Sequence, residues 1–474
     1  MGNAIELPDA PRRRLVQALL GAGLLGLAAQ PLRAQGLRIE NVTRLYPVAV
    51  ARIVRPRDAA EVQAAVRGWP GRIAVGGARF SMGGQIGTPG GLHLDMRGMD
   101  RICWIDAAAR RARVEAGLTW RALQDRLDPL HLAVKTMQSY SNFSVGGSVS
   151  VNAHGRYVRR GSIAATVRAL QLVLADGHRV ECSRDECPEL FAAALGGYGA
   201  VGVITEVELD LVPNERIERA VAAVPLADYP AFFAREVLRH DDSVLHNADL
   251  LPPRFDVAQA TTWRRSNRPL TESLRLTPRG ERHGAERALL WLATEAPGGS
   301  VLHGLRPSLA RAARVQWLNH EASLDVAELE PASRERSTYV LQEYFVPTAQ
   351  FQPFARAMAA CLQRRHVNAL NISVRHAGAD VDALLPWAPQ PVFAFVLYYK
   401  QGTDAAACEA VAGWTRELID LALAHGGRYY LPYQLHASQA QFERAYPEIE
   451  RLRALKRKVD PGRRFSNALW DKYL

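Results

Sequence analysis

Three glycine-rich segments in the first half of the chain constrain its fold more than any other feature. They read GGARFSMGGQ at 76–85, SVGGSVSVNAHGR at 144–156 and LGGYGAVG at 195–202. Because glycine has no Cβ, backbone N–H groups in such loops can approach a pyrophosphate group closely. One segment of this kind is typical of a turn, but three in one region exceed what turn formation requires. The sequence therefore predicts a site for a phosphate-bearing ligand.

The third segment also matches GxGxxG, with glycines at 197, 199 and 202. A dinucleotide-binding fingerprint of that form follows a strand and opens a helix. Here the order of the signals is reversed, because a helical pattern precedes the glycines and a strand pattern follows them. A Rossmann-type dinucleotide domain is therefore rejected.

Strand and helix signals alternate around these loops in an α+β pattern that Pro213 ends. A helix is expected after Asp58, which stands three residues before Glu61 as in a capping box. A hairpin is expected at 171–182, turning at Asp176-Gly177. Further strands are expected at 48–54, 72–75, 113–116 and 201–211, and further helices at 119–127 and 188–195.

The next region, from about 214 to 430, has a different pattern. It contains the β-rich runs STYVLQEYFVP and PVFAFVLYYK, with helical patterns at 351–365 and 405–425. This mixture predicts an antiparallel sheet covered by helices. The tail, 438–474, is expected to form a helix followed by DPGRRFSNALW.

The order of the three glycine-rich segments resembles the FAD-binding domain of the vanillyl-alcohol oxidase / p-cresol methylhydroxylase flavoprotein superfamily. Within it, QEYFVP at 342–347 and DPGRRFSNALW at 460–470 extend a similarity to aldonolactone and alditol oxidases over nearly the whole mature chain. The resemblance implies an α+β, two-domain flavoprotein. Its FAD-binding domain would span 37–213 and its antiparallel-sheet substrate domain 214–435, and a segment at 436–474 would return to the FAD domain.

The resemblance implies that FAD is bound by residues of the three glycine-rich segments and by one residue near the C-terminus. The residues implied are Gly76, Gly77, Ala78, Arg79, Phe80, Ser81, Gly84, Gln85, Ser141, Val145, Gly146, Gly147, Ser150, Asn152, His154, Gly155, Gly199, Gly202, Val203, Ile204 and Asn467.

Several members of the superfamily carry a histidine, joined covalently to the flavin, just before the serine of the first segment. Phe80 occupies that place here, and 138–150 contains no cysteine of the kind that other members use. The resemblance therefore implies non-covalent FAD, with His154 as the remaining alternative point of attachment. Because loss of the covalent bond generally lowers the oxidising power of a flavin, an oxygen-linked oxidase activity is less strongly implied.

The substrate side departs from the family pattern. Alditol oxidases place a Glu-x-Arg pair facing the flavin, and the corresponding residues here are Ser373 and Arg375. A His-Trp-Gly-Lys segment of the family is replaced by YYLPYQLHAS at 429–438. An arginine could stabilise a developing alkoxide or bind a carboxylate. The candidate catalytic residues by type are Arg375, His376, Lys400, Tyr433 and His436.

The first 36 residues are interpreted as an export signal. Arg12, Arg13 and Arg14 precede an apolar run at 15–29, and Leu-Arg-Ala at 32–34 offers a cleavage site. The run is too short for a stable membrane span, which needs about 20 residues. The paired arginines resemble a twin-arginine signal, and the alternatives are an ordinary secretory signal or an uncleaved anchor. A periplasmic or secreted location is expected.

Lys and Arg together number 59 and Asp and Glu 48, which gives a net charge of +11. The basic residues are dispersed and no aromatic-interleaved basic motif stands out, so nucleic-acid binding is not expected. The five cysteines form no CxxC pair and no metal-binding spacing is present, so no metal site is expected. Cys182 and Cys187 could form a disulfide or remain free thiols.

We therefore expect an FAD-dependent oxidoreductase that oxidises a CH–OH group of a sugar-like, polyol or lactone substrate, with oxygen or a periplasmic carrier as electron acceptor. One alternative is a flavoenzyme acting on a larger apolar substrate, such as a sterol or a prenyl-linked sugar. The aromatic and aliphatic side chains of PVFAFVLYYK favour this alternative. The other is a non-catalytic basic binding protein.

Overall fold

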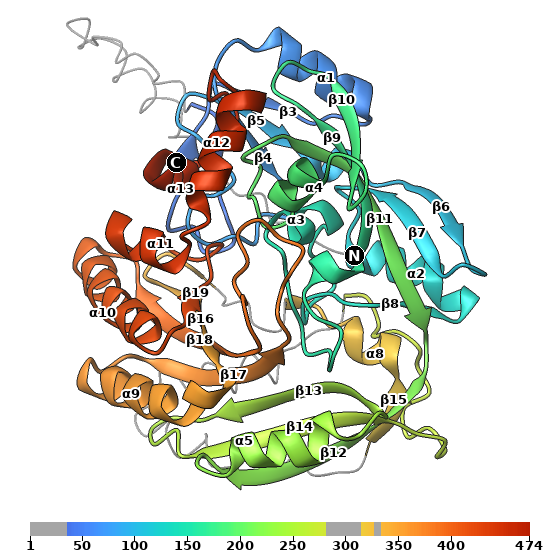
Figure 1. Ribbon diagram of the computed structural model, residues 1–474, viewed down its shortest axis with the longest axis vertical. Helices are drawn as coiled ribbons and strands as arrows, with labels where there is room; N and C mark the ends of the chain where they lie inside the picture. Colours follow the sequence, from blue (N-terminus) through green and yellow to red (C-terminus); the bar gives the residue numbers. More distant parts are fainter. Residues whose placement is uncertain (1–35, 281–313, 327–332) are drawn as a thin grey trace, which may run out of the picture. The chain divides into compact units, whose positions relative to one another are not determined.

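A computed structural model describes residues 36–280, 314–326 and 333–474 (Figure 1). The expected export signal at 1–36 lies almost entirely outside the described residues. The described part forms four sheets, one of two strands, one of three, one of six and one of eight. Within this part, no helix is long and apolar enough to cross a membrane.

A small three-stranded parallel sheet leads into the first glycine-rich segment. It comprises β3 (Arg52–Val54), β5 (Leu92–Asp95) and β4 (Ile73–Gly76), in that order. Helix α1 (Ala59–Gly68) connects β3 to β4, and Asp58 caps it by accepting a 2.8 Å hydrogen bond from Glu61 N. Glu61 accepts from Arg57 N instead of completing the capping box.

The expected strand at 48–54 is wrong as a single element. Strand β2 (Val48–Ala49) pairs antiparallel with β1 (Arg38–Ile39), whereas β3 pairs parallel with β5. The chain passes from one sheet to the other between them, where Val50 N bonds to Leu37 O and Ala51 N bonds to Gly91 O. The change of partner, which local sequence does not encode, divides the run.

The second sheet has the order β10-β9-β11-β7-β6, with β8 also paired to β11. The expected hairpin is confirmed as β9 and β10, with Gly177 at φ +80° in its turn. The strands of this six-stranded sheet are β6 (Ile102–Asp106), β7 (Arg111–Glu115), β8 (Leu132–Val134), β9 (Val167–Val173), β10 (Arg179–Ser183) and β11 (Val203–Pro213). Its helices are α2 (Trp120–Leu127), α3 (Val145–Ser150) and α4 (Pro188–Ala194).

The third layer is an eight-stranded antiparallel sheet in the order β15-β12-β14-β13-β17-β18-β16-β19. Its strands are β12 (Arg216–Pro225), β13 (Ser243–Leu250), β14 (Val257–Arg265), β15 (Arg314–Trp317), β16 (Ser337–Pro347), β17 (Ala369–Ala377), β18 (Val392–Gly402) and β19 (Arg428–Tyr429). The helices of this region are α5 (Tyr229–Phe232), α8 (Leu318–Ala322), α9 (Phe351–Arg364) and α10 (Ala405–Ala424).

One face of this sheet is covered by helices, as the sequence predicts. Phe354 of α9 packs edge-on against Phe395 of β18, with ring centroids 5.0 Å apart, and Trp414 of α10 packs against Tyr399, 4.8 Å away. Side chains alternate between the faces of a strand. Val396 is one position from Phe395 and therefore belongs to the opposite face, and so does Glu343, which is opposite Val396 on β16.

The tail contains more helices than expected: α11 (Gln439–Ala445), α12 (Ile449–Val459) and α13 (Ala468–Tyr473). The break between α11 and α12 contains Pro447, which ends a helix readily. The segment after α12 returns to the parallel sheet of β3, β5 and β4 (Figure 1). There Phe465 forms a β-bridge with Ile73. Lys456 is buried there and donates to Ala200 O, Phe465 O and Asp460 Oδ2, each at 2.7 Å.

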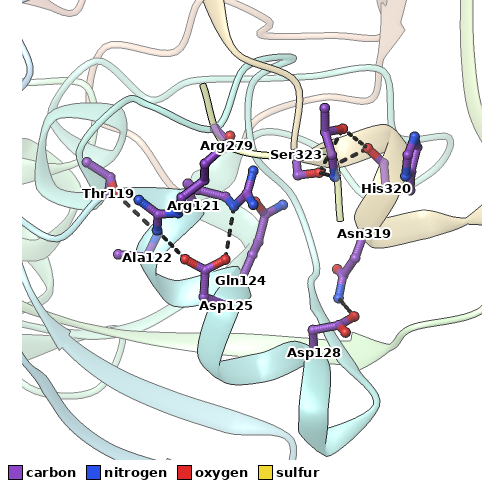
Figure 2. A network of polar contacts seen from close by, with 12 residues as sticks. Thr119, Arg121, Ala122, Gln124, Asp125, Asp128, Arg279, Asn319, His320 and Ser323 are labelled. Atoms are coloured by element: carbon purple, nitrogen blue, oxygen red, sulfur yellow. Dashed lines mark hydrogen bonds and ion pairs between the residues drawn. The ribbon is translucent and has the colours of Figure 1, made fainter. Parts of the chain in front are cut away.

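A polar network joins α2 to the segments on either side of 281–313 (Figure 2). Asp125 accepts from Arg121 and from Arg279, and Asp128 Oδ1 accepts from Asn319 Nδ2 at 2.9 Å. Gln124 Nε2 donates to Ala322 O at 3.0 Å. These contacts attach α8 to the FAD-domain side, next to the loop at 138–143.

All five cysteines are free thiols, Cys182 buried and Cys187 exposed. No disulfide joins that pair in the structure.

Candidate active site

One large cavity joins the three glycine-rich segments to the uncovered face of the eight-stranded sheet. The space between its lining residues is about 1520 Å³, including the open solvent at its mouth. The predicted residues that line it are Gly77, Ala78, Arg79, Phe80, Ser81, Gln85, Gly146, Gly147, Ser150, His154, Gly199, Gly202, Ile204, Arg375 and Tyr433. Those that do not line it are Gly76, Gly84, Ser141, Val145, Asn152, Gly155, Val203, Lys400, His436 and Asn467.

The first two glycine-rich segments approach each other closely. A Cβ on Gly77 would lie 2.1 Å from Ser144 Oγ, and Ser144 Oγ accepts a hydrogen bond from Ala78 N at 3.2 Å. A Cβ on Gly146 would lie 2.5 Å from that of Ala116 on the loop after β7. Side chains at these positions would close the space between the segments, which explains the glycines physically.

The third segment forms another part of the wall, beside the second, where Tyr198 N bonds to Ser150 O. Gly199 has φ +74°, a conformation that favours glycine. Asn467 lies behind this wall, where its Nδ2 donates to Tyr198 O at 2.9 Å. Helix α4 precedes the segment and β11 follows it, which confirms the order on which the Rossmann interpretation was rejected.

The cavity wall presents buried polar atoms that have no protein partner. Arg79 pairs with Asp95 Oδ2 at 3.2 Å through Nη2, but its Nε has no partner, and neither does Ser139 Oγ. Burying an unpaired polar group costs about 1–3 kcal/mol, so these atoms fit a ligand that accepts or donates hydrogen bonds. Glycine-rich walls, apolar surfaces and unpaired donors together suit FAD.

Four polar side chains from four segments of the chain line the end of the cavity nearest the sheet. His154 Nε2 lies 2.5 Å from Glu343 Oε1, and Tyr433 Oη donates to Glu343 Oε2 at 3.2 Å. Burial raises the pKa of Tyr433 well above its usual value, and the neighbouring Glu343 carboxylate adds to this shift. The fourth side chain, Arg375, lines the same cavity, and its Nε is buried without a partner.

The cross-strand register explains how Glu343 and Arg375 share one face. Glu343 on β16 is opposite Val396 on β18, which is opposite Ser373 on β17. Arg375 follows Ser373 by two positions and therefore has the same orientation. The family pattern has a glutamate at the position of Ser373. In this sheet the carboxylate, Glu343, lies two strands away from that position on the same face.

The sequence motifs did not predict Glu343 as a site residue, although it lies within the segment QEYFVP. The available signal was that Glu343 is the only charged residue of its strand, Ser337–Pro347. His154 was assigned to the cofactor only, and its contact with Glu343 spans 189 residues of sequence.

Three candidate catalytic residues lie elsewhere. Lys400 is on the same sheet face but lies further along β18, with Nζ 5.9 Å from the centre of the Tyr339 ring. His376 lies one position from Arg375 and packs against Phe233, 4.8 Å away. His436 is outside the cavity lining, and burial lowers its pKa to about 4.

Comparison with known families identifies both halves of this arrangement. The FAD binding domain family matches residues 50–183, and the D-arabinono-1,4-lactone oxidase family matches residues 258–473. The chain is an FAD-dependent oxidoreductase. The two matches confirm the resemblance to the vanillyl-alcohol oxidase superfamily and to its aldonolactone and alditol oxidases.

Two curated relatives cover most of the length of this FAD-dependent oxidoreductase, and another covers about a third of it. It is 23% identical over 460 residues to the L-gulonolactone oxidase of Bos taurus, covering 92% of this chain and 98% of that protein. It is 26% identical over 436 residues to the L-gulono-1,4-lactone dehydrogenase of Mycobacterium tuberculosis, covering 88% and 95%. It is 34% identical over 163 residues to the alditol oxidase of a Streptomyces species, covering 34% and 38%.

Proposed function

We propose that the enzyme oxidises a CH–OH group of a sugar-derived lactone or of an alditol to a carbonyl group. The relatives named above act, by their names, on gulonolactones and alditols. The observation that carries the proposal is Arg375, a cavity-lining cation with an unpaired buried Nε at the sheet end of the cavity. A hydroxylated substrate would supply the missing acceptor.

The glycine-rich walls, Arg79 and Ser139 would hold FAD. When bound, FAD supplies the acceptor for the hydride that leaves the substrate carbon. We propose that it is bound non-covalently, because Phe80 cannot form the bond that a histidine makes at this position. The chain's own residues then exclude water, position the hydroxyl group and receive its proton.

Arg375 is the positioning group in this proposal. Its planar guanidinium can donate two parallel hydrogen bonds to neighbouring substrate oxygens, which fixes orientation as well as charge. The donor also stabilises the negative charge that develops on the hydroxyl oxygen as its proton leaves. Tyr433 remains a neutral phenol because of its raised pKa and acts here as a donor to Glu343.

The electron acceptor is proposed to be oxygen or a periplasmic carrier, and the export route a twin-arginine signal. The three consecutive arginines at residues 12–14 support this route. The twin-arginine route also carries folded proteins, so that a cofactor can be bound before export. Replacing Arg12, Arg13 and Arg14 by Lys should leave precursor in the cytoplasm on immunoblots of cell fractions. Normal export of the triple variant would favour the ordinary secretory route.

A dye-linked assay tests the proposed activity independently of the natural acceptor. Purified holoenzyme is mixed with an artificial electron acceptor and, separately, L-gulono-1,4-lactone, D-arabinono-1,4-lactone and an alditol such as sorbitol. Dye reduction with one of these classes supports the proposal. Reduction only with a sterol or a prenyl-linked sugar would replace it with the apolar-substrate alternative.

A further inference from the structure

We propose that Glu343 is the proton acceptor of the reaction, held in place by His154 and Tyr433. The inference rests on the proposed function, since it assigns the base for the oxidation of a hydroxyl group. In this step the substrate O–H bond breaks and its proton passes to Glu343 Oε2. The C–H bond breaks as hydride passes to FAD, and the C–O bond becomes a carbonyl.

The composition of the cavity wall restricts the choice of acceptor. Among the described residues that line the cavity, Glu343 carries the only carboxylate and His154 the only imidazole. Burial raises the pKa of the lining residues Tyr198, Tyr430 and Tyr433, so these phenols keep their protons. Arg79 and Arg375 are cations that do not accept a proton.

The contacts of the pair favour the carboxylate over the imidazole. His154 is 5% exposed and its ring lies against Trp387, with centroids 4.8 Å apart. Its Nε2 is already directed at Glu343 Oε1. Glu343 retains a second oxygen, Oε2, whose one hydrogen bond from the described residues is the longer 3.2 Å bond from Tyr433.

The position of the carboxylate also suits the role. Glu343 is 2% exposed and faces the same side of the sheet as Arg375, which would hold the hydroxyl oxygen. A group that accepts the proton must lie within hydrogen-bond reach of that oxygen. His154 comes from the second glycine-rich segment, so its bond to Glu343 ties the acceptor to the cofactor-binding wall.

The test uses the FAD-loaded enzyme, L-gulono-1,4-lactone, D-arabinono-1,4-lactone and sorbitol under anaerobic rapid mixing. Glu343→Gln should reduce its flavin about 10²–10⁴-fold more slowly than the wild type, the usual contribution of general base catalysis. Glu343→Gly should be accelerated by added formate, a small carboxylate that can occupy the vacated place. Glu206→Gln is the matched control, because Glu206 lies outside the cavity and its partner Arg113 keeps Glu181.

Two readouts separate a base from a residue that merely supports the fold. The first is FAD affinity, measured by fluorescence titration of apoprotein, which should change little in Glu343→Gln. The second is the infrared difference spectrum of the anaerobic wild type on reduction, which should gain a protonated-carboxyl band that Glu343→Gln lacks. The infrared measurement on the wild type decides the matter even where a variant does not fold.

Two results would overturn the assignment of Glu343 while leaving the proposed function intact. One is that these substrates reduce the flavin of Glu343→Gln as fast as that of the wild type. The other is that the carboxyl band is absent from the wild-type spectrum. Formate acceleration of His154→Gly in place of Glu343→Gly would also overturn it, in favour of the imidazole. A wild-type flavin that none of the substrates reduces would instead overturn the proposed function, and this assignment with it.

Discussion

The ring of Phe80 stacks on the ring of Phe143, with centroids 4.1 Å apart and planes 22° apart. The stack joins the first glycine-rich segment to the loop before the second, on the wall of the cofactor cavity. An aromatic contact thus takes the place at which related flavoproteins have a covalent link. Such pairs contribute about 0.5–1.5 kcal/mol beyond the area they bury.

This contact leads to a prediction about flavin release. Because Phe80 offers no nucleophilic atom, acid precipitation of the purified enzyme should leave a colourless pellet and a yellow supernatant. The absorbance of the two fractions in the visible range measures this directly. A yellow pellet would contradict non-covalent binding and would direct attention to His154.

Arg375 should be needed for flavin reduction but not for flavin binding. Arg375→Ala should slow anaerobic reduction by about 10²–10³-fold, the usual effect of removing an electrostatic stabiliser. Arg375→Lys should restore little, because an ammonium group keeps the charge but lacks the planar fork. Stopped-flow measurements of both variants test this, and a normal rate in Arg375→Ala would refute the role.

Lys456 should stabilise the fold around the third glycine-rich segment. Its partner Asp460 is 0% exposed, so Lys456→Met leaves a buried carboxylate without a cation. The expected loss is about 3–5 kcal/mol in the free energy of unfolding. Urea unfolding compares this variant with Lys458→Met, a change of an exposed neighbour, and equal stability of the two would contradict the prediction.

Acid should destabilise the fold through His246. Burial lowers its pKa to about 3, while an unfolded histidine titrates near about 6.5. Below that pH the unfolded chain binds a proton that the folded chain refuses, so stability falls as pH decreases from about 6.5 toward 3, by at most about 1.4 kcal/mol per pH unit. Above this range the contribution is constant.

The measurement is urea unfolding of the wild type and His246→Gln at about pH 7 and about pH 5. The variant should lose about 1–2 kcal/mol less than the wild type between the two values. Its overall stability should be lower, because Tyr229 Oη and Thr262 Oγ1 lose an imidazole partner. Parallel acid losses in the two proteins would show that His246 is not the group responsible.

The elements that local sequence specifies were predicted well. Helix α9 begins at Phe351 and α10 ends at Ala424, within a residue of the expected bounds. Both have a strong apolar face, which is a property of the nearby sequence. The division of 48–54 between two sheets was not predictable, because the partners of β2 and β3 are distant in sequence.

The same distinction applies to the site. Gly77, Gly146 and Gly199 were found because close backbone approach leaves a local signal. Glu343 was not, because its place beside Arg375 follows from the register of β16, β18 and β17 and from no motif. Lys400 was selected by residue type at a strand end, and only the register shows how far along β18 it lies from Val396.

Anaerobic visible spectroscopy tests the central claim most directly. The purified enzyme should show the absorption bands of oxidised flavin, and addition of L-gulono-1,4-lactone, D-arabinono-1,4-lactone or sorbitol should bleach them in the wild type and far more slowly in Arg375→Ala. A protein that is colourless and takes up no added FAD, or a bound flavin that no lactone or polyol bleaches, would contradict the claim.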